Sequence, residues 1–391
     1  MKLLVIGLGQ CGGRIADEFA RLGMRARIQR KINIITGAFA VNTDVADLTG
    51  LYSIRSDYRH RILIGGKKTS GHGVGKINEL GAEIAREDSD KIIDAIKTTA
   101  QFPETDAFLL AAGAAGGTGS GAIPTVTRYL KERYVEKPVY NLIVLPFQHE
   151  EQIEGRTIYN SATCLKSAYL VADAVILVDN QRYIRKDLSI RSNLAQINAS
   201  IIEPFYDLLC TGEEKKSKYI GSRILDAGDI IQTLTGWTVI GHGKSQIPRT
   251  RTLFSGKYGF REKAGESQKG VQAMDKAVGE LSLQCKPADA GRGLYLLSAP
   301  PEEMDMSLIK ELGAYLKTIA TEAIIRIGDY PRGKDTFNIT VILSELSNVI
   351  KITAYFTKAI DFITTLKKKQ EGIEYEHRGI GETFNDIPSL L

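Results

Sequence analysis

The sequence has little of what ties a chain together covalently or anchors it in a bilayer. Its four cysteines stand far apart, with no CxxC pair and no histidine nearby, so a disulfide framework and a zinc site are excluded and reduced thiols are expected. No apolar run approaches the ~20 residues that a membrane helix needs. The apolar start of the chain breaks at Gly7, which is too early for a signal peptide. We therefore expect a cytoplasmic protein without direct membrane insertion.

An excess of charge of one sign is also missing. Lysine and arginine number 51 against 46 aspartates and glutamates, and the net charge of +5 is spread along the chain, which argues against a nucleic-acid partner. The rest of the composition, with 43% hydrophobic and 25% charged residues, is that of an ordinary globular protein. A length of 391 residues predicts two or three domains.

Short apolar runs alternate with helical patterns through the first half of the chain. The predicted strands are residues 3–6, 34–41, 62–64, 107–112, 139–145 and 174–178. Helical spacing predicts helices over about 12–21, 78–86 and 91–98. Strands alternating with helices predict a doubly wound parallel sheet, which binds its ligands outside the carboxyl ends of its strands.

The second half begins with a long predicted helix over residues 188–209, which Gly212 ends. The elements predicted beyond it are strands at 238–240, 294–298 and 337–343 and helices at 270–283 and 307–325. Residues 243–268 are polar and rich in Gly, Lys and Arg, which predicts a surface loop. We therefore expect a second α/β domain with a mixed sheet. The expected regions are a first domain at 1–186, a central core helix at 187–212, a second domain at 213–366 and a C-terminal tail at 367–391.

The first motif is a glycine loop directly after the first predicted strand. Gly7, Gly9 and Gly12 form a GxGxxG pattern that opens a helix, where backbone amides and the helix N-terminus can hold a phosphate. Alone, the pattern also fits a tight turn without a ligand or a dinucleotide-dependent oxidoreductase. That enzyme needs an acidic residue roughly 20 residues after the glycines. Here the second strand comes later and ends in residues 41–44, with the sequence VNTD.

A second glycine loop, residues 113–121, follows the strand at 107–112 and precedes a helix with Pro124 in its first turn. Two such loops in one chain indicate a polyphosphate held from two sides, for which a dehydrogenase has no use. The stretch GGTGSG at 116–121 resembles the signature loop of the tubulin/FtsZ superfamily. The resemblance extends over nearly the whole chain, in particular to the archaeal tubulin-like CetZ proteins. It implies a tubulin/FtsZ-like fold, with a GTP-binding first domain and a GTPase-activating second domain.

The resemblance also implies which residues bind GTP and GDP. They are Gly9, Gln10, Cys11, Gly12, Gly13, Arg14, Asn42, Gly71, Gly73, Gly75, Gly116, Gly117, Thr118, Gly119, Ser120, Glu154, Asn180 and Asn198. Glu154 is expected to hold the ribose, and Asn180 and Asn198 are expected to bind the guanine edge, whose donors and acceptor an amide can complement. Asn180 also fits a turn after a strand. No metal-ligating residues are expected, because phosphates and water would hold most of the Mg²⁺ shell.

The third motif is the acidic pair Asp226 and Asp229. In the family that the chain resembles, this loop enters the nucleotide pocket of the next subunit and orients the attacking water. The resemblance therefore implies a head-to-tail homopolymer with assembly-dependent hydrolysis, and a role in cell shape. The same pair fits the start of a helix, where an N-cap and a first-turn charge are favoured. The alternative is that the protein is not an enzyme but a scaffold that binds nucleotide without hydrolysing it.

The last twelve residues, 380–391, are polar with a small apolar end. They loosely resemble the C-terminal peptide by which FtsZ recruits partner proteins. A partner protein that binds the tail is one interpretation, and an end without a partner is the other.

Overall fold

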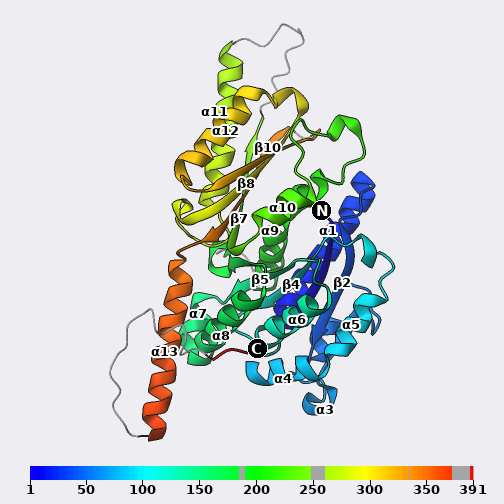
Figure 1. Ribbon diagram of the computed structural model, residues 1–391, viewed down its shortest axis with the longest axis vertical. Helices are drawn as coiled ribbons and strands as arrows, with labels where there is room; N and C mark the ends of the chain where they lie inside the picture. Colours follow the sequence, from blue (N-terminus) through cyan, green and yellow to red (C-terminus); the bar gives the residue numbers. More distant parts are fainter. Residues whose placement is uncertain (185–189, 248–259, 334, 372–387, 391) are drawn as a thin grey trace. The chain divides into compact units, whose positions relative to one another are not determined.

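The computed structural model describes residues 1–184, 190–247, 260–333, 335–371 and 388–390 (Figure 1). Internal contacts divide it into two compact units. The first, which we name the parallel-sheet unit, consists of residues 2–25, 35–202 and 349–391. The second, the mixed-sheet unit, consists of Met1 together with residues 26–34 and 203–348.

Within the described residues, the parallel-sheet unit is built on six parallel strands in the order β3-β2-β1-β4-β5-β6. They are β1 (Leu3–Leu8), β2 (Ile35–Asn42), β3 (Arg61–Leu63), β4 (Ala107–Gly113), β5 (Val139–Leu145) and β6 (Ala174–Asp179). β1, β5 and β6 are buried along their whole length, as expected for strands covered by helices on both faces. These strands confirm the sequence prediction, with ends displaced by one or two residues.

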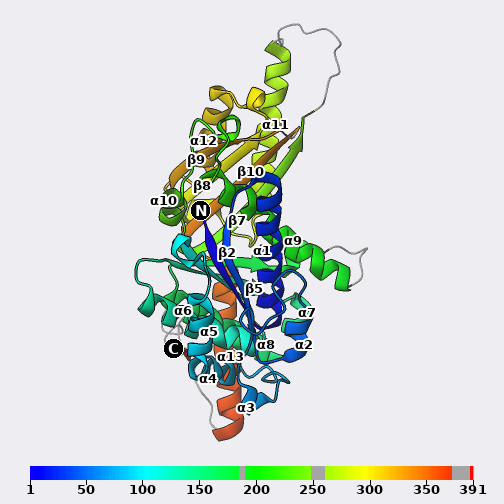
Figure 2. The same ribbon diagram turned by 90° about the vertical axis from the view of Figure 1, so that its right-hand side faces the viewer.

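Helices connect and cover these strands. They are α1 (Gly9–Arg30), α2 (Val45–Thr49), α3 (Gly66–Thr69), α4 (Asn78–Glu87), α5 (Ser89–Lys97), α6 (Thr118–Arg133), α7 (Gln148–Ile153), α8 (Gly155–Val171), α9 (Ile190–Thr211) and α13 (Ile350–Glu371), with 3-10 turns at Phe102–Glu104 and Asn180–Tyr183. Figure 2 shows α1 and α6 on opposite faces of the sheet. They follow the neighbouring strands β1 and β4, so the winding of the chain reverses between these strands, where α/β sheets bind their ligands.

The sequence pattern did not predict helix α13. Its buried residues Ile352, Tyr355 and Ala359 recur at helical spacing, and Ala359 packs against Ala162 of α8. Packing on α8 thus stabilises a helix that its own sequence signals weakly. The helix continues to Glu371, so the predicted start of the tail at residue 367 falls inside it.

The mixed-sheet unit contains strands in the order β7-β10-β8-β9. Its elements are β7 (Gly236–Gln246), β8 (Ala290–Ala299), β9 (Ile324–Pro331), β10 (Thr336–Leu346), α10 (Ala227–Thr233), α11 (Phe260–Gly279) and α12 (Met306–Ile319), with 3-10 turns at Ser217–Tyr219, Pro287–Asp289 and Pro301–Glu303. β10 runs antiparallel to β7 and β8, whereas β8 and β9 are parallel. The predicted mixed sheet is therefore confirmed.

Two predictions in this unit are wrong in part. The helix predicted over 307–325 ends at Ile319, and Ile324–Pro331 forms β9, where β-branched isoleucines pair with β8. The loop predicted over 243–268 belongs at its start to β7 and at its end to α11, while 248–259 lie outside the described residues. Gly243 was interpreted as a loop residue, whereas it lies in β7 at a close contact between that strand and α11. A Cβ there would lie 1.9 Å from the Ala273 carbonyl oxygen of α11.

None of the helices in the described part of the chain combines the length and hydropathy of a membrane span.

Candidate functional site

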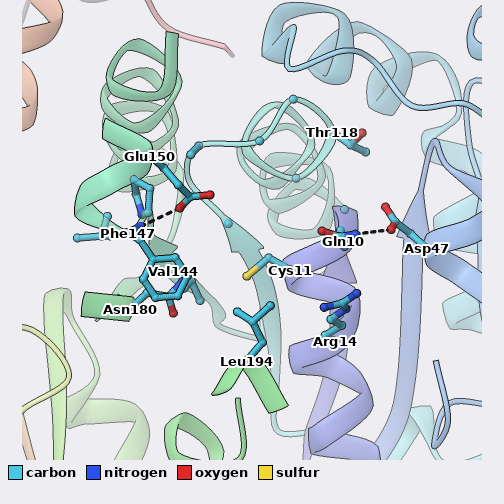
Figure 3. Close-up of a pocket in the computed structure, with 18 of the residues that line it drawn as sticks. Gln10, Cys11, Arg14, Asp47, Thr118, Val144, Phe147, Glu150, Asn180 and Leu194 are labelled. Atoms are coloured by element: carbon cyan, nitrogen blue, oxygen red, sulfur yellow. Dashed lines mark hydrogen bonds between the residues drawn. The ribbon is translucent and has the colours of Figure 1, made fainter. Parts of the chain in front are cut away.

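A cavity of about 610 Å³ lies at the carboxyl ends of the parallel strands, and the parallel-sheet unit supplies all of its lining. Leu8 at the end of β1, Gly113 at the end of β4 and Leu145 at the end of β5 contribute to it. The two glycine loops meet here, since a Cβ on Gly9 would lie 2.8 Å from the backbone nitrogen of Gly119. The cavity thus occupies the switch point between β1 and β4. Figure 3 shows residues that line it.

Most of the residues expected to bind nucleotide line this cavity. They are Gly9, Gln10, Cys11, Arg14, Asn42, Gly73, Gly116, Gly117, Thr118, Gly119, Asn180 and Asn198. The expected residues that do not line it are Gly12, Gly13, Gly71, Gly75, Ser120 and Glu154. Two of these contact the backbone next to the loops. A Cβ on Gly12 would lie 2.0 Å from the Ala111 carbonyl oxygen, and the buried Ser120 hydroxyl donates a hydrogen bond to the Gly116 carbonyl.

The glycines of the second loop differ in what surrounds them. A Cβ on Gly117 would lie 2.9 Å from both the Ile77 nitrogen and the Lys76 Cα, and one on Gly119 would lie 2.6 Å from the Leu8 carbonyl oxygen. Packing inside the protein therefore already requires glycine at these two positions. A Cβ on Gly116 would meet no described atom within 4 Å. Gly116 thus lines the cavity and has open space at its Cβ position.

Polar contacts from α8 hold the segment before α4 against the second glycine loop. Lys76 has a left-handed backbone, with φ at 61°, and its carbonyl accepts hydrogen bonds from Asn160 Nδ2 at 2.9 Å and Arg156 Nε at 3.2 Å. Asn160 Nδ2 also lies 3.1 Å from the carbonyl oxygens of Ala115 and Gly116. Sequence reasoning missed Lys76 and Asn160. The spacing of Arg156 and Asn160 by one helical turn was the available signal.

Glu154, the residue expected to hold the ribose, pairs with the side chain of Lys76. Its Oε2 lies 2.7 Å from Lys76 Nζ, and both side chains are close to half exposed. Lys76 lines the cavity and Glu154 does not. An ion pair this exposed contributes little to stability, so either side chain can change its partner at low cost.

Carboxylates and amides share one wall of the cavity. Gln10 Nε2 donates to Asp47 Oδ1 at 2.6 Å, and Asn42 Nδ2 donates to Asp47 Oδ2 at 3.0 Å. Cys11 lies beside them (Figure 3), and burial raises the pKa of its thiol to about 12. The thiol is therefore neutral at physiological pH and unsuited to nucleophilic chemistry.

The opposite side of the cavity is more apolar. Figure 3 shows Phe147 and Asn180 across the cavity from Gln10 and Asp47. The Phe147 ring stacks with His149 at a centroid distance of 5.6 Å, and Glu150 Oε2 accepts from the Phe147 backbone N–H at 2.8 Å. Helix α9 adds Leu194, Ile197 and Asn198 to the lining of the cavity. An apolar wall with amide side chains suits a flat polar ring such as a base.

The acidic pair lies in the mixed-sheet unit and does not line the cavity. Asp226 is the N-cap of α10, and its Oδ1 accepts from the Asp229 backbone N–H at 2.9 Å. Asp229 Oδ1 in turn accepts from Arg326 Nη1 at 2.6 Å. The predicted start of a helix at these residues is therefore confirmed.

Two glycine loops that face each other at the switch point of a parallel sheet define a nucleotide-binding α/β protein. Residues 2–186 match the model of the Tubulin/FtsZ family, GTPase domain, and residues 187–361 match that of the Tubulin-like CetZ, C-terminal domain. Tubulin-like protein CetZ1 of Haloferax volcanii is 34% identical, covering 92% of each chain. The chain belongs to the tubulin/FtsZ family, and within it to the tubulin-like CetZ proteins.

Solved structures of CetZ proteins are similar as well. The GDP-bound monomer of CetZ1 from Haloferax volcanii has a TM-score of 0.79 at 32% identity, covering 93% of this chain and all of that one. The GTPγS-bound protofilament of CetZ2 from the same organism also has a TM-score of 0.79, at 25% identity, covering 94% of this chain and all of that one. The expected tubulin/FtsZ-like α/β fold is thereby confirmed.

Proposed function

We propose that the chain is a cytoskeletal GTPase that binds GTP and GDP and polymerises head to tail. The observation that carries this proposal is the cavity. Two glycine loops meet in it, and Asn180 and Asn198 line it together with the apolar wall that suits a base. Similar proteins support it, since CetZ1 was solved with GDP and CetZ2 as a protofilament with GTPγS. A cytoplasmic filament that controls cell shape is the cellular role we propose.

In this proposal the glycine loops hold the phosphates with backbone amides. α1 and α6 both begin at the cavity, so the positive ends of two long helices face the bound anion. Arg14 and Lys76 supply side-chain positive charge. Glu154 reaches the ribose only after it leaves Lys76, to which it is paired in the structure.

The site residues also bear on how a Mg²⁺ ion would be held. In the described residues, no group of three or more His, Cys, Asp or Glu side chains is placed to hold a metal ion. Both carboxylate oxygens of Asp47 already accept hydrogen bonds from Gln10 and Asn42. Mg²⁺ would therefore be bound mainly by the phosphates and water.

Hydrolysis is proposed to need the neighbouring subunit. Asp226 and Asp229 belong to the mixed-sheet unit, whereas the parallel-sheet unit supplies the lining of the cavity. A neighbour's pair would orient the water that attacks the γ-phosphate. Arg326 holds the Asp229 carboxylate in one orientation, and positioning is most of what phosphoryl transfer requires. The contact is heterologous and does not close into a ring, so it produces open filaments.

Phosphate release measured against protein concentration tests this proposal. A shared active site requires the specific rate to rise steeply at the concentration at which light scattering and negative-stain images report filaments with GTP. Filaments without phosphate release would establish the scaffold without turnover instead. Copurification of a nicotinamide dinucleotide would establish the oxidoreductase.

A further inference from the structure

The last described residues of the chain, 388–390, lie against the parallel-sheet unit, and Figure 1 shows the C-terminus near α4, α6 and α8. The backbone N–H of Leu390 donates to Ser167 Oγ at 2.8 Å, and its carbonyl accepts from Arg86 Nη2 at 3.5 Å. Leu390 is only 7% exposed, whereas Pro388 and Ser389 are exposed. The contact is therefore centred on one residue near the end of the chain.

The chemistry of this contact is that of a peptide site. Ser167 on α8 binds the N–H of Leu390 and Arg86 on α4 binds its carbonyl, so both main-chain groups of one residue are bound while its side chain is enclosed. Main-chain hydrogen bonds together with a pocket for one side chain are how extended peptides are recognised. Ser167 is fully buried, so its hydroxyl depends on a partner from within the protein.

We propose that α4 and α8 form a peptide-binding site on the parallel-sheet unit, whose ligand is the chain's own segment 388–390, with the apolar Leu390 side chain enclosed. This site is distinct from the nucleotide cavity, because neither Arg86 nor Ser167 lines that cavity. The proposal does not depend on GTP binding or on polymerisation.

Tethering favours the chain's own tail as the ligand. Sixteen residues join the end of α13 to Pro388, so the tail meets its site at an effective concentration that is on the order of millimolar for a tether of this length. A site with an intrinsic dissociation constant of ~0.1 mM is then about 90% occupied in the monomer. Any protein that binds the tail must first displace it from α4 and α8.

Digestion of the full chain by carboxypeptidase tests the site while the tail keeps its wild-type sequence. Cleavage follows the population of the open form when release and docking are fast, so 90% occupancy slows loss of the last residues about tenfold relative to the free peptide 376–391. Ser167→Val removes the acceptor for Leu390 and should accelerate digestion at least fivefold. Ser161→Ala, at a buried serine on the same helix that bonds the Thr157 carbonyl, is the matched control and should digest at the wild-type rate.

Three outcomes would overturn the proposal, provided circular dichroism shows native folding. The wild-type end could be digested as fast as the free peptide. Ser167→Val could digest at the same rate as Ser161→Ala. Protection that disappears on dilution to nanomolar protein would assign the tail to a neighbouring copy instead of its own chain. Protection that is independent of concentration and lost in Ser167→Val supports the proposal.

Discussion

Gly116→Val separates ligand binding from packing at the second glycine loop. The position lines the cavity, and a Cβ there would meet no described atom within 4 Å. The new side chain therefore occupies space that a phosphate would use, without a cost inside the protein. We expect GTP affinity to fall at least 100-fold, or about 2.7 kcal/mol, while the free energy of unfolding changes by less than about 1 kcal/mol.

Gly117 shows why the neighbouring glycine is a poorer choice. A Cβ there would lie 2.5 Å from Val74 Cγ2 and 2.9 Å from the Ile77 nitrogen. Overpacking of this kind typically destabilises by about 1–3 kcal/mol. Loss of GTP binding by a Gly117 variant would therefore report on folding as much as on the phosphate site.

Calorimetric titration with GTP and thermal unfolding of the same samples provide the two readouts. Gly66→Val is the matched control, because Gly66 is exposed, lies outside the cavity and also has no described atom within 4 Å of its Cβ position. The control should keep both GTP affinity and stability. Normal GTP binding by a folded Gly116→Val protein would refute the inference that this loop holds phosphates.

Three further predictions address the base, the acidic pair and the mixed-sheet unit. Asn198→Ala should weaken the binding of guanine nucleotides by about 1–3 kcal/mol, because the polar edge of the guanine loses its amide partner. Calorimetry that shows equal wild-type affinity for ATP and GTP would exclude the guanine assignment. Asp229→Ala should keep GTP affinity, lose roughly 10²–10³-fold in phosphate release and leave longer-lived filaments; an undiminished rate would place the chemistry within one subunit. His242 is half-buried in β7, its ring Nε2 is enclosed without a hydrogen-bond partner among the described residues, and burial lowers the pKa of the imidazole to about 4. Because the unfolded histidine binds its proton near pH 6.5, the unfolding free energy should fall by up to about 3 kcal/mol as the pH drops from 6.5 to 4. Urea titrations should lose this part of the pH dependence in His242→Gln, and an unchanged slope would contradict the assignment.

The strands of the parallel sheet could be predicted from the sequence because each is an apolar run bounded by turn residues. The start of α1 at Gly9 and the helix α13 could not. Glycine lowers helix propensity, so the pattern placed the start of α1 at about residue 12. α13 depends on packing against α8, which lies far away in the sequence.

The candidate site was predictable where it depends on motifs. Gly9, Gly116 and Asn180 were predicted from the loops and the resemblance, and all of them line the cavity. Lys76 and Asn160 were not found, because their contacts join segments about 40 to 80 residues apart. The spacing of Arg156 and Asn160 by one helical turn places both side chains on one face of α8, but it does not say which distant backbone they bind.

Asn160 has a consequence for how a ligand would enter. One amide nitrogen lies within hydrogen-bond distance of three carbonyl oxygens from two loops, those of Lys76, Ala115 and Gly116. The spacing of the loops is therefore fixed when α8 packs, and the left-handed backbone of Lys76, worth roughly 1–3 kcal/mol of strain, is included in the free energy of folding. Binding to such a preorganised cavity involves less loss of loop entropy. In the function proposed above, a subunit that has released its nucleotide would accept another without refolding its loops.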